Sequence, residues 1–236
     1  MDRIRDPGYS AHMDLVIFDL DGTLINSEAI LLAAQVETFV RHGLVHPGRE
    51  AGLGVIGLTL NIALMRLGGL ALPDEALTAT YKEVFGAMRQ QALSDAALDE
   101  PLFPGVAGTL ATLGARPGLK LGIATGKSRR GADYIIERHG WGGLFATIQT
   151  ADDAISKPHP QMILQAMAET RSRPERTLMV GDSSFDMEMA AAAGVIPVAV
   201  SWGFQPVGAL RAAGARHVIE RCDALLDIVD GRPQPA

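Results

Sequence analysis

The sequence of 236 residues contains a single cysteine and no long apolar run, and each shortage excludes a class of protein. Cys222 alone can form neither an intrachain disulfide nor a thiolate zinc cluster, which favours a reducing compartment. No apolar run approaches the roughly 18 residues that a membrane-spanning helix requires. We therefore expect a cytoplasmic protein without a membrane partner.

Basic residues are too few and too scattered for a nucleic-acid-binding surface. The 21 lysines and arginines are outnumbered by 27 aspartates and glutamates, which gives a formal net charge of -6. They form neither a sustained basic run nor a basic and aromatic alternation, so we expect no nucleic-acid partner. The first segment, Met1–His12, is polar and lacks the apolar part of a secretion signal, and we predict a loose leader. The last segment, Asp230–Ala236, is rich in helix breakers and is expected to fray.

Short apolar runs rich in β-branched residues recur along the chain and predict the strands of an α/β protein. Stretches of helical composition separate them after the second run, and this alternation favours a parallel sheet with helices on both faces. Ligands of such open sheets bind at the carboxyl ends of the strands. The predicted strands are Leu15–Phe18, Leu119–Ala124, Phe145–Gln149, Thr177–Val180 and Val195–Val200, and the predicted helices between them are Ser128–His139, Gln161–Glu169 and Phe185–Ala193.

Residues 26–101 break this alternation because they carry only helical patterns, at 28–42, 58–67 and 74–91. Glycines and prolines punctuate these helices and close the segment. We predict a helical cap over residues 26–101, inserted into an α/β core formed by residues 1–25 and 102–236. An insert that leaves the core beside a reaction centre is well placed to act as a lid. The alternative is a helical layer packed permanently on the sheet.

The first predicted strand ends in two aspartates, Asp19 and Asp21, followed by Gly22. A chain that leaves the strand at Asp19 can bring both carboxyl groups toward one point at the carboxyl end of the sheet. Two acids there could share a metal ion and divide nucleophilic and acid/base work. The pattern is typical of a phosphoryl-transfer site; the alternative is an acidic turn after a buried strand.

The end of the second predicted strand and a later loop supply candidate phosphate-binding groups. Thr125 and Gly126 follow the second strand, where a hydroxyl and backbone N–H groups at a helix start suit a phosphate oxygen. Ser128 fits better as the cap of that helix. Lys157 lies in a loop that Pro158 and Pro160 stiffen, where it could neutralise a phosphoryl oxygen and keep the aspartates ionised.

The fourth strand ends at Asp182, and Asp186 follows on the first turn of the next helix. Mg²⁺ prefers oxygen ligands, usually one or two carboxylates, waters and substrate phosphate. Asp19, Asp182 and the backbone carbonyl of Asp21 would supply this set, and we predict Mg²⁺ as the cofactor. For Asp186 the alternative to a metal role is an acid favourably placed in a first helical turn.

Together these four motifs resemble those of the haloacid dehalogenase superfamily, in the phosphoglycolate phosphatase-like branch. The resemblance covers nearly the whole chain and implies a Rossmann-like sheet with an inserted helical cap. It implies that the segment from Asp19 to Thr23 is the nucleophile motif, that Thr125 is the phosphate-binding hydroxyl and that Lys157 is the family's lysine. It also implies that Asp182 and Asp186 form the metal motif.

The resemblance leads us to expect a phosphoric monoester hydrolase that acts on a small phosphorylated metabolite. Asp19 would attack phosphorus to form an aspartyl phosphate, and Asp21 would protonate the leaving group and then activate water. Because Asp21 is an acid, dehalogenation and phosphonate cleavage are improbable. Branch resemblance makes phosphoglycolate the leading substrate. The alternatives are a sugar-phosphate mutase of the β-phosphoglucomutase type and a non-catalytic phosphate-binding regulatory protein.

Substrate contacts are predicted at Gly22, Thr125, Gly126 and Lys157, and at Arg49 in the cap. Arg49 begins a glycine-punctuated stretch, 49–57, which we predict to be a loop before a helix. Arg49 could contact a substrate carboxylate or phosphate, or it could be a solvated loop residue. Lys127, Arg129 and Arg130 form a positive cluster that either steers anions or is a solvated helical turn. The sequence makes no prediction of oligomeric state.

Overall fold

A six-stranded parallel sheet forms the centre of the molecule, with strand order β3-β2-β1-β4-β5-β6. The computed structural model describes residues 13–92 and 95–232, so the predicted leader and residues 233–236 of the predicted frayed tail lie outside the described residues. The strands are β1 (Leu15–Phe18), β2 (Lys120–Ala124), β3 (Thr147–Gln149), β4 (Thr177–Gly181), β5 (Ile196–Val200) and β6 (His217–Ile219).

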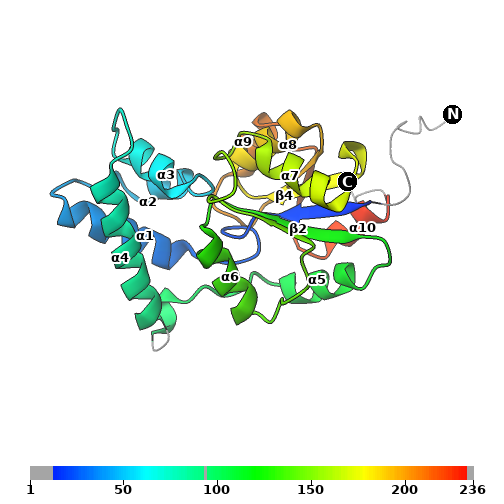
Figure 1. Cartoon of the computed structure of the whole chain (residues 1–236), viewed down its shortest axis with the longest axis horizontal. Helices are drawn as coiled ribbons and strands as arrows, with labels where there is room; N and C mark the ends of the chain where they lie inside the picture. The colour runs from blue at the N-terminus through cyan, green and yellow to red at the C-terminus, as the bar shows by residue number, and fades with distance from the viewer. Residues whose placement is uncertain (1–12, 93–94, 233–236) are drawn as a thin grey trace.

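Helices cover both faces of the sheet, as Figure 1 shows. Side chains alternate along β1, so Val16 and Phe18 belong to the apolar cluster on one face and Leu15 and Ile17 to that on the other. The first cluster includes residues of α5 (Val106–Gly114), α6 (Arg129–Arg138) and α10 (Ala224–Val229), and the second includes residues of α7 (Gln161–Thr170) and α8 (Ser184–Ala193). Two further elements, η2 (Pro174–Arg176) and α9 (Val207–Ala212), precede β4 and β6.

The predicted α/β class and parallel sheet are confirmed, and the five predicted strands are present with ends shifted by at most two residues. The sequence prediction missed β6, because its three residues lie between Arg216 and Glu220 and are too few to give an apolar pattern. Among the described residues, no helix has the length and apolar character that crossing a bilayer would require.

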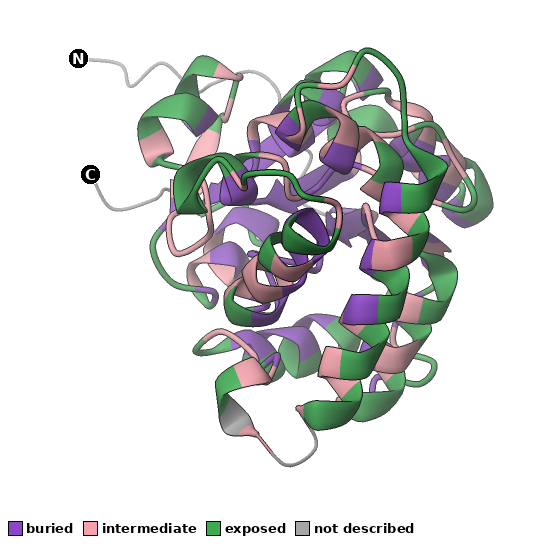
Figure 2. Cartoon of the chain, turned by 90° about the vertical axis from the view of Figure 1, so that its left-hand side faces the viewer, coloured by how far each residue is buried: buried purple, intermediate pink, exposed green. Residues whose placement is uncertain are grey.

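The segment between β1 and α5 folds into a separate group of helices, which we call the helical unit. It consists of α1 (Glu28–Arg41), α2 (Arg49–Gly54), α3 (Leu60–Leu67), α4 (Glu75–Gln91) and the short η1 (Ala96–Leu98). The unit has an apolar cluster of its own, which includes Phe39 and Leu77. In Figure 1 it stands beside the sheet, and Figure 2, which views the molecule from that side, shows that its helices carry both buried and exposed residues.

The predicted loop over residues 49–57 is wrong for its first six residues, which form α2. Two glycines lower the helical propensity of this stretch, but packing on α1 outweighs that preference. Gln35 of α1 donates a hydrogen bond from Nε2 to the carbonyl of Gly52 at 3.1 Å, and Leu53 is buried. Tertiary contacts therefore fix a helix that local composition does not predict.

The chain enters and leaves the helical unit through two adjacent crossings. Ile25 and Leu102 form an antiparallel bridge, and the Asn26 N–H donates to the Pro101 carbonyl at 2.8 Å. This pairing supports a division of the chain near 25/26 and 101/102, and the division into two domains stays a prediction.

Candidate active site

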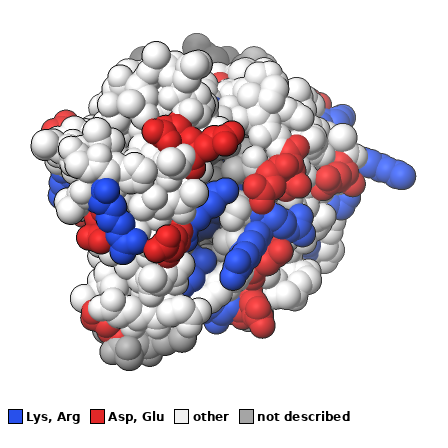
Figure 3. Space-filling model, turned by 60° about the vertical axis from the view of Figure 1, so that its left-hand side comes forward, with Lys and Arg blue, Asp and Glu red and all other residues white. Residues whose placement is uncertain are grey.

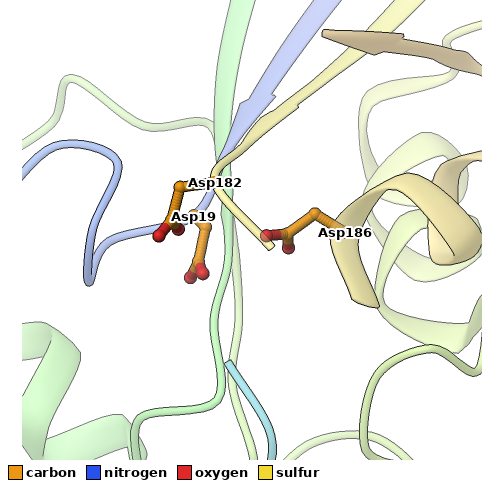
Figure 4. A group of neighbouring side chains, drawn as sticks. All are labelled: Asp19, Asp182 and Asp186. Carbon is orange, nitrogen blue, oxygen red and sulfur yellow. The ribbon is translucent and has the colours of Figure 1, made fainter. Parts of the chain in front are cut away.

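Three aspartates meet at the carboxyl ends of the two central strands. Asp19 follows β1, Asp182 follows β4, and Asp186 lies in the first turn of α8. One carboxylate oxygen of each lies within 4.8 Å of the others, and all three residues are buried. Figure 4 shows Asp19 and Asp182 side by side, with Asp186 directed toward them from its helix. The topology thus brings together residues more than 160 positions apart in the sequence, because parallel strands end at one edge.

Asp19 has one oxygen fixed and one oxygen free of hydrogen bonds among the described residues. Its Oδ1 accepts from the Leu20 N–H at 2.7 Å. Lys157 Nζ lies 3.0 Å from Oδ2 as an ion pair, yet Oδ2 makes no hydrogen bond. Burial raises the pKa of Asp19 to about 7; Lys157 opposes this rise, and the charges of Asp186 and Asp21 add to it. Oδ2 is therefore the oxygen available for chemistry.

Asp182 is held against the turn that follows β1. Its Oδ2 accepts from the Phe204 N–H at 2.8 Å, and its Oδ1 accepts from Thr23 Oγ1 at 3.2 Å. Burial, together with the charges of Asp186 and Asp19, raises the pKa of Asp182 well above its usual range. Gly22 has a φ of +78°, and a Cβ there would lie 2.1 Å from Asp182 Oδ2. Only glycine permits this turn at this distance.

Lys157 is enclosed by two of the three acids. Its Nζ donates to Asp186 Oδ1 at 2.7 Å and pairs with Asp19 as described above. Burial lowers the pKa of Lys157, but Asp186 and Asp19 more than offset this, so the pKa lies above its ordinary value. The other oxygen of Asp186 accepts from the N–H and Oγ of Ser183, which caps α8. Both oxygens of Asp186 thus have partners already.

The charge balance of this cluster fits a divalent cation. Three buried carboxylates face a single lysine, so two negative charges lack a counter-charge within the cluster when the acids are ionised. An isolated charge is costly to bury, and the all-oxygen donor set is the kind that Mg²⁺ prefers. Asp19 Oδ2 is the oxygen best placed to bind an ion, because it has no hydrogen bond. The residues therefore fit the predicted metal.

Asp21 lies in a second, separate group of charges. Its Oδ1 accepts a short hydrogen bond from Ser27 Oγ, and Lys127 Nζ lies 2.8 Å from the same oxygen. Lys127 also pairs with Glu100 at 3.3 Å, and the side chains of both residues are almost fully buried. The interpretation of Lys127 as a solvated residue of a helical turn is therefore wrong, whereas Arg129 and Arg130 are exposed; anion steering by this cluster stays a prediction.

Sequence reasoning missed Lys127 and Glu100 because each looks like a surface charge in its own segment. Positive charges at a helix start normally remain in water, and Glu100 follows Asp99 directly before Pro101, where a solvated acid is the usual expectation. Their positions in the sequence could have indicated that they lie near the site. Lys127 comes two residues after Thr125, and Glu100 lies at the predicted boundary of the cap.

The loop after β2 meets the helical unit. Thr125 is buried and its Oγ1 accepts from the Lys127 N–H at 3.2 Å. Ser128 Oγ accepts from the Gly131 N–H, which confirms the capping interpretation. A Cβ on Gly126 would lie 2.5 Å from the Leu58 carbonyl oxygen of the helical unit. At the neighbouring loop, the Thr59 N–H donates to Ser156 Oγ at 3.0 Å, so residues 57–59 lie directly over the loops that follow β2 and β3.

The predicted contact residue Arg49 pairs with a residue that belongs to neither charge group. It lies on α2, pairs with Glu28 at 2.6 Å and is mostly exposed. It lines an open cleft of about 730 Å³ between α2 and the core, whose core side includes Ser184 and Gln205. Figure 3 shows basic and acidic side chains interspersed on this side of the molecule, without a broad patch of one sign.

Comparison with known proteins identifies what this chain is similar to. A family model described as haloacid dehalogenase-like hydrolase matches residues 16–200. The probable phosphatase IndB of Dickeya dadantii is 34% identical over 207 residues, which are 87% of this chain and 89% of that protein. The pyrophosphatase PpaX of Halalkalibacterium halodurans is 32% identical over 92% of this chain and 97% of its own length.

Two further similarities cover almost the full length of both chains. The phosphoglycolate phosphatase of Synechococcus elongatus is 31% identical over 92% of this chain and 97% of that protein. The crystal structure of a hydrolase from Pseudomonas syringae superposes with a TM-score of 0.79 at 26% identity, covering 94% of this chain and all of that one.

Proposed function

The chain belongs to the haloacid dehalogenase-like hydrolase family, and from this premise we propose that it is a Mg²⁺-dependent phosphatase of small phosphorylated metabolites. It is an enzyme of a family in which several of its relatives are named as phosphatases. One observation carries the proposal. Asp19 presents a buried oxygen without a hydrogen bond, next to Lys157 and two further acids, at the carboxyl edge of a parallel sheet.

In the proposed first step, a carboxylate oxygen of Asp19 attacks phosphorus, a new P–O bond forms to the carboxylate, and the bond from phosphorus to the leaving oxygen breaks. Asp21 gives its proton to that oxygen. In the second step Asp21 takes a proton from water, the water oxygen attacks phosphorus, and Asp19 leaves as a carboxylate. Lys157, the Thr125 hydroxyl and the backbone N–H groups near Gly22 and Gly126 would hold the phosphoryl oxygens.

Two carboxylates cannot account for the acceleration that phosphate-monoester hydrolysis requires, which reaches about 10²¹-fold. Most of it must come from positioning and charge stabilisation. Mg²⁺, when bound by Asp19, Asp182 and the Asp21 carbonyl, would neutralise charge on the phosphoryl group. Since both oxygens of Asp186 have protein partners, we propose that Asp186 mainly holds Lys157 and the start of α8.

For the substrate, we propose a small ester or anhydride that fits beneath the helical unit, with this unit acting as the cap. Phosphoglycolate and pyrophosphate are the leading candidates, because relatives of similar identity are named for each. A sugar-phosphate mutase would use the same two acids but return the phosphoryl group to a second hydroxyl. The two activities differ in product, which is free phosphate for the hydrolase and an isomeric sugar phosphate for the mutase.

The test is release of inorganic phosphate from a panel of small phosphate esters that includes phosphoglycolate, pyrophosphate and hexose phosphates. Each is incubated with Mg²⁺ or with EDTA. We expect release only with metal, and almost none from the Asp19→Asn variant, which keeps the shape of the side chain but loses the nucleophilic charge. Circular dichroism and thermal unfolding establish that the variant is folded.

Substantial release by a pure, folded Asp19→Asn protein would contradict the assignment of the nucleophile. An isomerised hexose phosphate without free phosphate would favour the mutase. No turnover of any ester by the folded, Mg²⁺-supplied protein would favour the non-catalytic binding role.

A further inference from the structure

Lys127 has a largely buried side chain in the loop after β2, and its charge has no part in the motifs that led to the proposed function. Its Nζ lies 2.8 Å from Asp21 Oδ1 and 3.3 Å from Glu100 Oε1, and 9% of its side chain is exposed. Burial lowers the pKa of Lys127, but the carboxylates of Asp21 and Glu100 more than offset this and keep it charged. A buried cation held between two carboxylates is a fixed structural element.

Glu100 is itself fixed by the helical unit. Arg89 of α4 donates to Glu100 Oε2 from both Nε, at 3.1 Å, and Nη2, at 2.8 Å, and this two-point pair is nearly buried. The Arg89 guanidinium lies over two aromatic rings, 4.7 Å from the centroid of Phe85 and 4.1 Å from that of Tyr134. Since Tyr134 is on α6, which covers the sheet, the contact links the helical unit to the sheet and its helices.

The contacts of Asp21 distinguish its two oxygens. Lys127 and the Ser27 hydroxyl both contact Oδ1. Two polar contacts on one oxygen fix the rotation of the carboxyl group, which leaves Oδ2 for proton exchange with a substrate. A group that transfers a proton must be within hydrogen-bond reach of the reacting atom, and its orientation decides whether it is.

We propose that Lys127 is a positioning residue for Asp21, which it orients with Oδ2 toward the leaving oxygen, and that Glu100 and Arg89 hold Lys127 in place from the side of the helical unit. The inference rests on the proposed phosphatase function and deepens it. Lys127 bonds neither phosphorus nor the leaving group. Its role is confined to the step in which Asp21 gives up a proton and becomes a carboxylate beside the lysine cation.

The test compares two classes of ester by their kcat/KM, which reports steps up to transfer of the phosphoryl group to Asp19. An aryl ester such as p-nitrophenyl phosphate has a leaving group that departs without a proton, whereas a simple alkyl phosphate needs one. We expect Lys127→Met to raise the aryl-to-alkyl ratio of kcat/KM at least about tenfold, which is part of the roughly 10²–10⁴-fold that a positioned acid contributes.

The matched control is Lys82→Met, the same change at an exposed lysine of α4, which should leave both kcat/KM values unchanged. The second variant is Glu100→Gln, which keeps Lys127 but weakens its anchor and should raise the ratio by a smaller factor. If Lys127→Met does not fold, the aryl-to-alkyl ratio of kcat/KM of Glu100→Gln alone tests the proposal.

An equal loss on both esters, or no loss on either, would overturn the role of Lys127, because a purely structural residue does not distinguish leaving groups. If the unsubstituted protein hydrolyses neither ester, the phosphatase and the inference fail together. If it hydrolyses both and the variants keep its ratio, only the inference fails.

Discussion

The two aspartates of the first motif are only two positions apart, but their surroundings are built from different parts of the chain. Asp19 contacts Lys157 and lies beside the acids that follow β4, all of which lie on the strands, loops and helices of the sheet and outside the helical unit. Asp21 meets Lys127, which is fixed in turn by Glu100 at the edge of the helical unit. The half of the site that would bond phosphorus is therefore complete within the core, whereas the half that would serve the leaving group is shared with the helical unit.

The strongest test of this contrast is Lys157→Met. We expect it to lower kcat/KM by roughly 10²–10³-fold, as the loss of one well-placed charge at a reaction centre does. In contrast to Lys127→Met, it should affect aryl and alkyl esters equally, because Lys157 faces the phosphoryl group. Removing one partner of a buried ion pair also destabilises a protein by about 3–5 kcal/mol, so thermal unfolding must be measured alongside the kinetics. A changed aryl-to-alkyl ratio would contradict the contrast.

A smaller effect is expected where the helical unit lies over the site. Gly126→Ala places a Cβ 2.5 Å from the Leu58 carbonyl oxygen, so residues 57–59 must move away from the loop after β2. We expect kcat/KM for a small ester to fall by roughly ten- to a hundredfold, because small displacements at a site are costly. Gly142→Ala is the control, since a Cβ there meets nothing within 4 Å. Equal kinetics for the two variants would show that this contact is unimportant.

Metal binding and pH should act together on the stability of the Asp19 half. The pKa of Asp19 is raised to about 7 in the folded protein from 3.8, so the folded state holds the proton more tightly than the unfolded state. Its contribution to stability is therefore full below about pH 4 and is lost as pH rises toward about 7. Without metal, we expect the unfolding temperature to fall over this window. At a pH above this window, adding Mg²⁺ should raise the unfolding temperature by several degrees, since a ligand at about 100 times its Kd adds roughly 2.7 kcal/mol to the free energy of unfolding.

The readout is thermal unfolding with Mg²⁺ or EDTA at pH about 5 and about 8. Asp19→Asn should lose much of the difference, because the amide does not titrate in this range. A Mg²⁺ effect that is larger at the lower pH would contradict the assignment of the cation to these carboxylates.

The smallest effect is expected at Arg49, whose role as a substrate contact stays a prediction. Its guanidinium is exposed and pairs with Glu28, and exposed pairs contribute little. If Arg49 contacts the carboxylate of an anionic leaving group, Arg49→Gln should raise KM for phosphoglycolate by less than about fivefold and leave KM for p-nitrophenyl phosphate unchanged. Arg129→Gln removes a comparably exposed arginine on α6 and serves as control. An equal rise in KM for both esters would exclude a specific contact between Arg49 and the leaving group.

The parts of the fold that sequence predicts are those fixed by local patterns. The apolar runs of β1 and β4 and the helical stretches between strands are visible because burial on two faces requires them. The strand ends then place Asp19 and Asp182 at one edge, as the structure has them. The catalytic and metal roles of these residues stay predictions.

Other parts depend on contacts between distant segments and left no local pattern. Helix α2 is held by its packing on α1, and β6 is specified mainly by pairing with β5. Lys127 is buried only because Asp21 and Glu100, 106 and 27 positions away in the sequence, approach it in space. A charge that resembles a surface residue in its own segment can thus be a buried one, and only the assembled fold distinguishes the two.

The two crossings at 25/26 and 101/102 have a consequence for how such a protein can diversify. The segments that enter and leave the helical unit are hydrogen-bonded to each other. For the rest of the chain, the intervening helices are therefore equivalent to a loop whose two ends are already held together. Such a loop can be lengthened, replaced or recombined with little cost in chain entropy and without disturbing the sheet. Under the proposed function, the core would keep the reaction while the helical unit changes the substrate, and Ser27 and Glu100 lie beside the junction of the two.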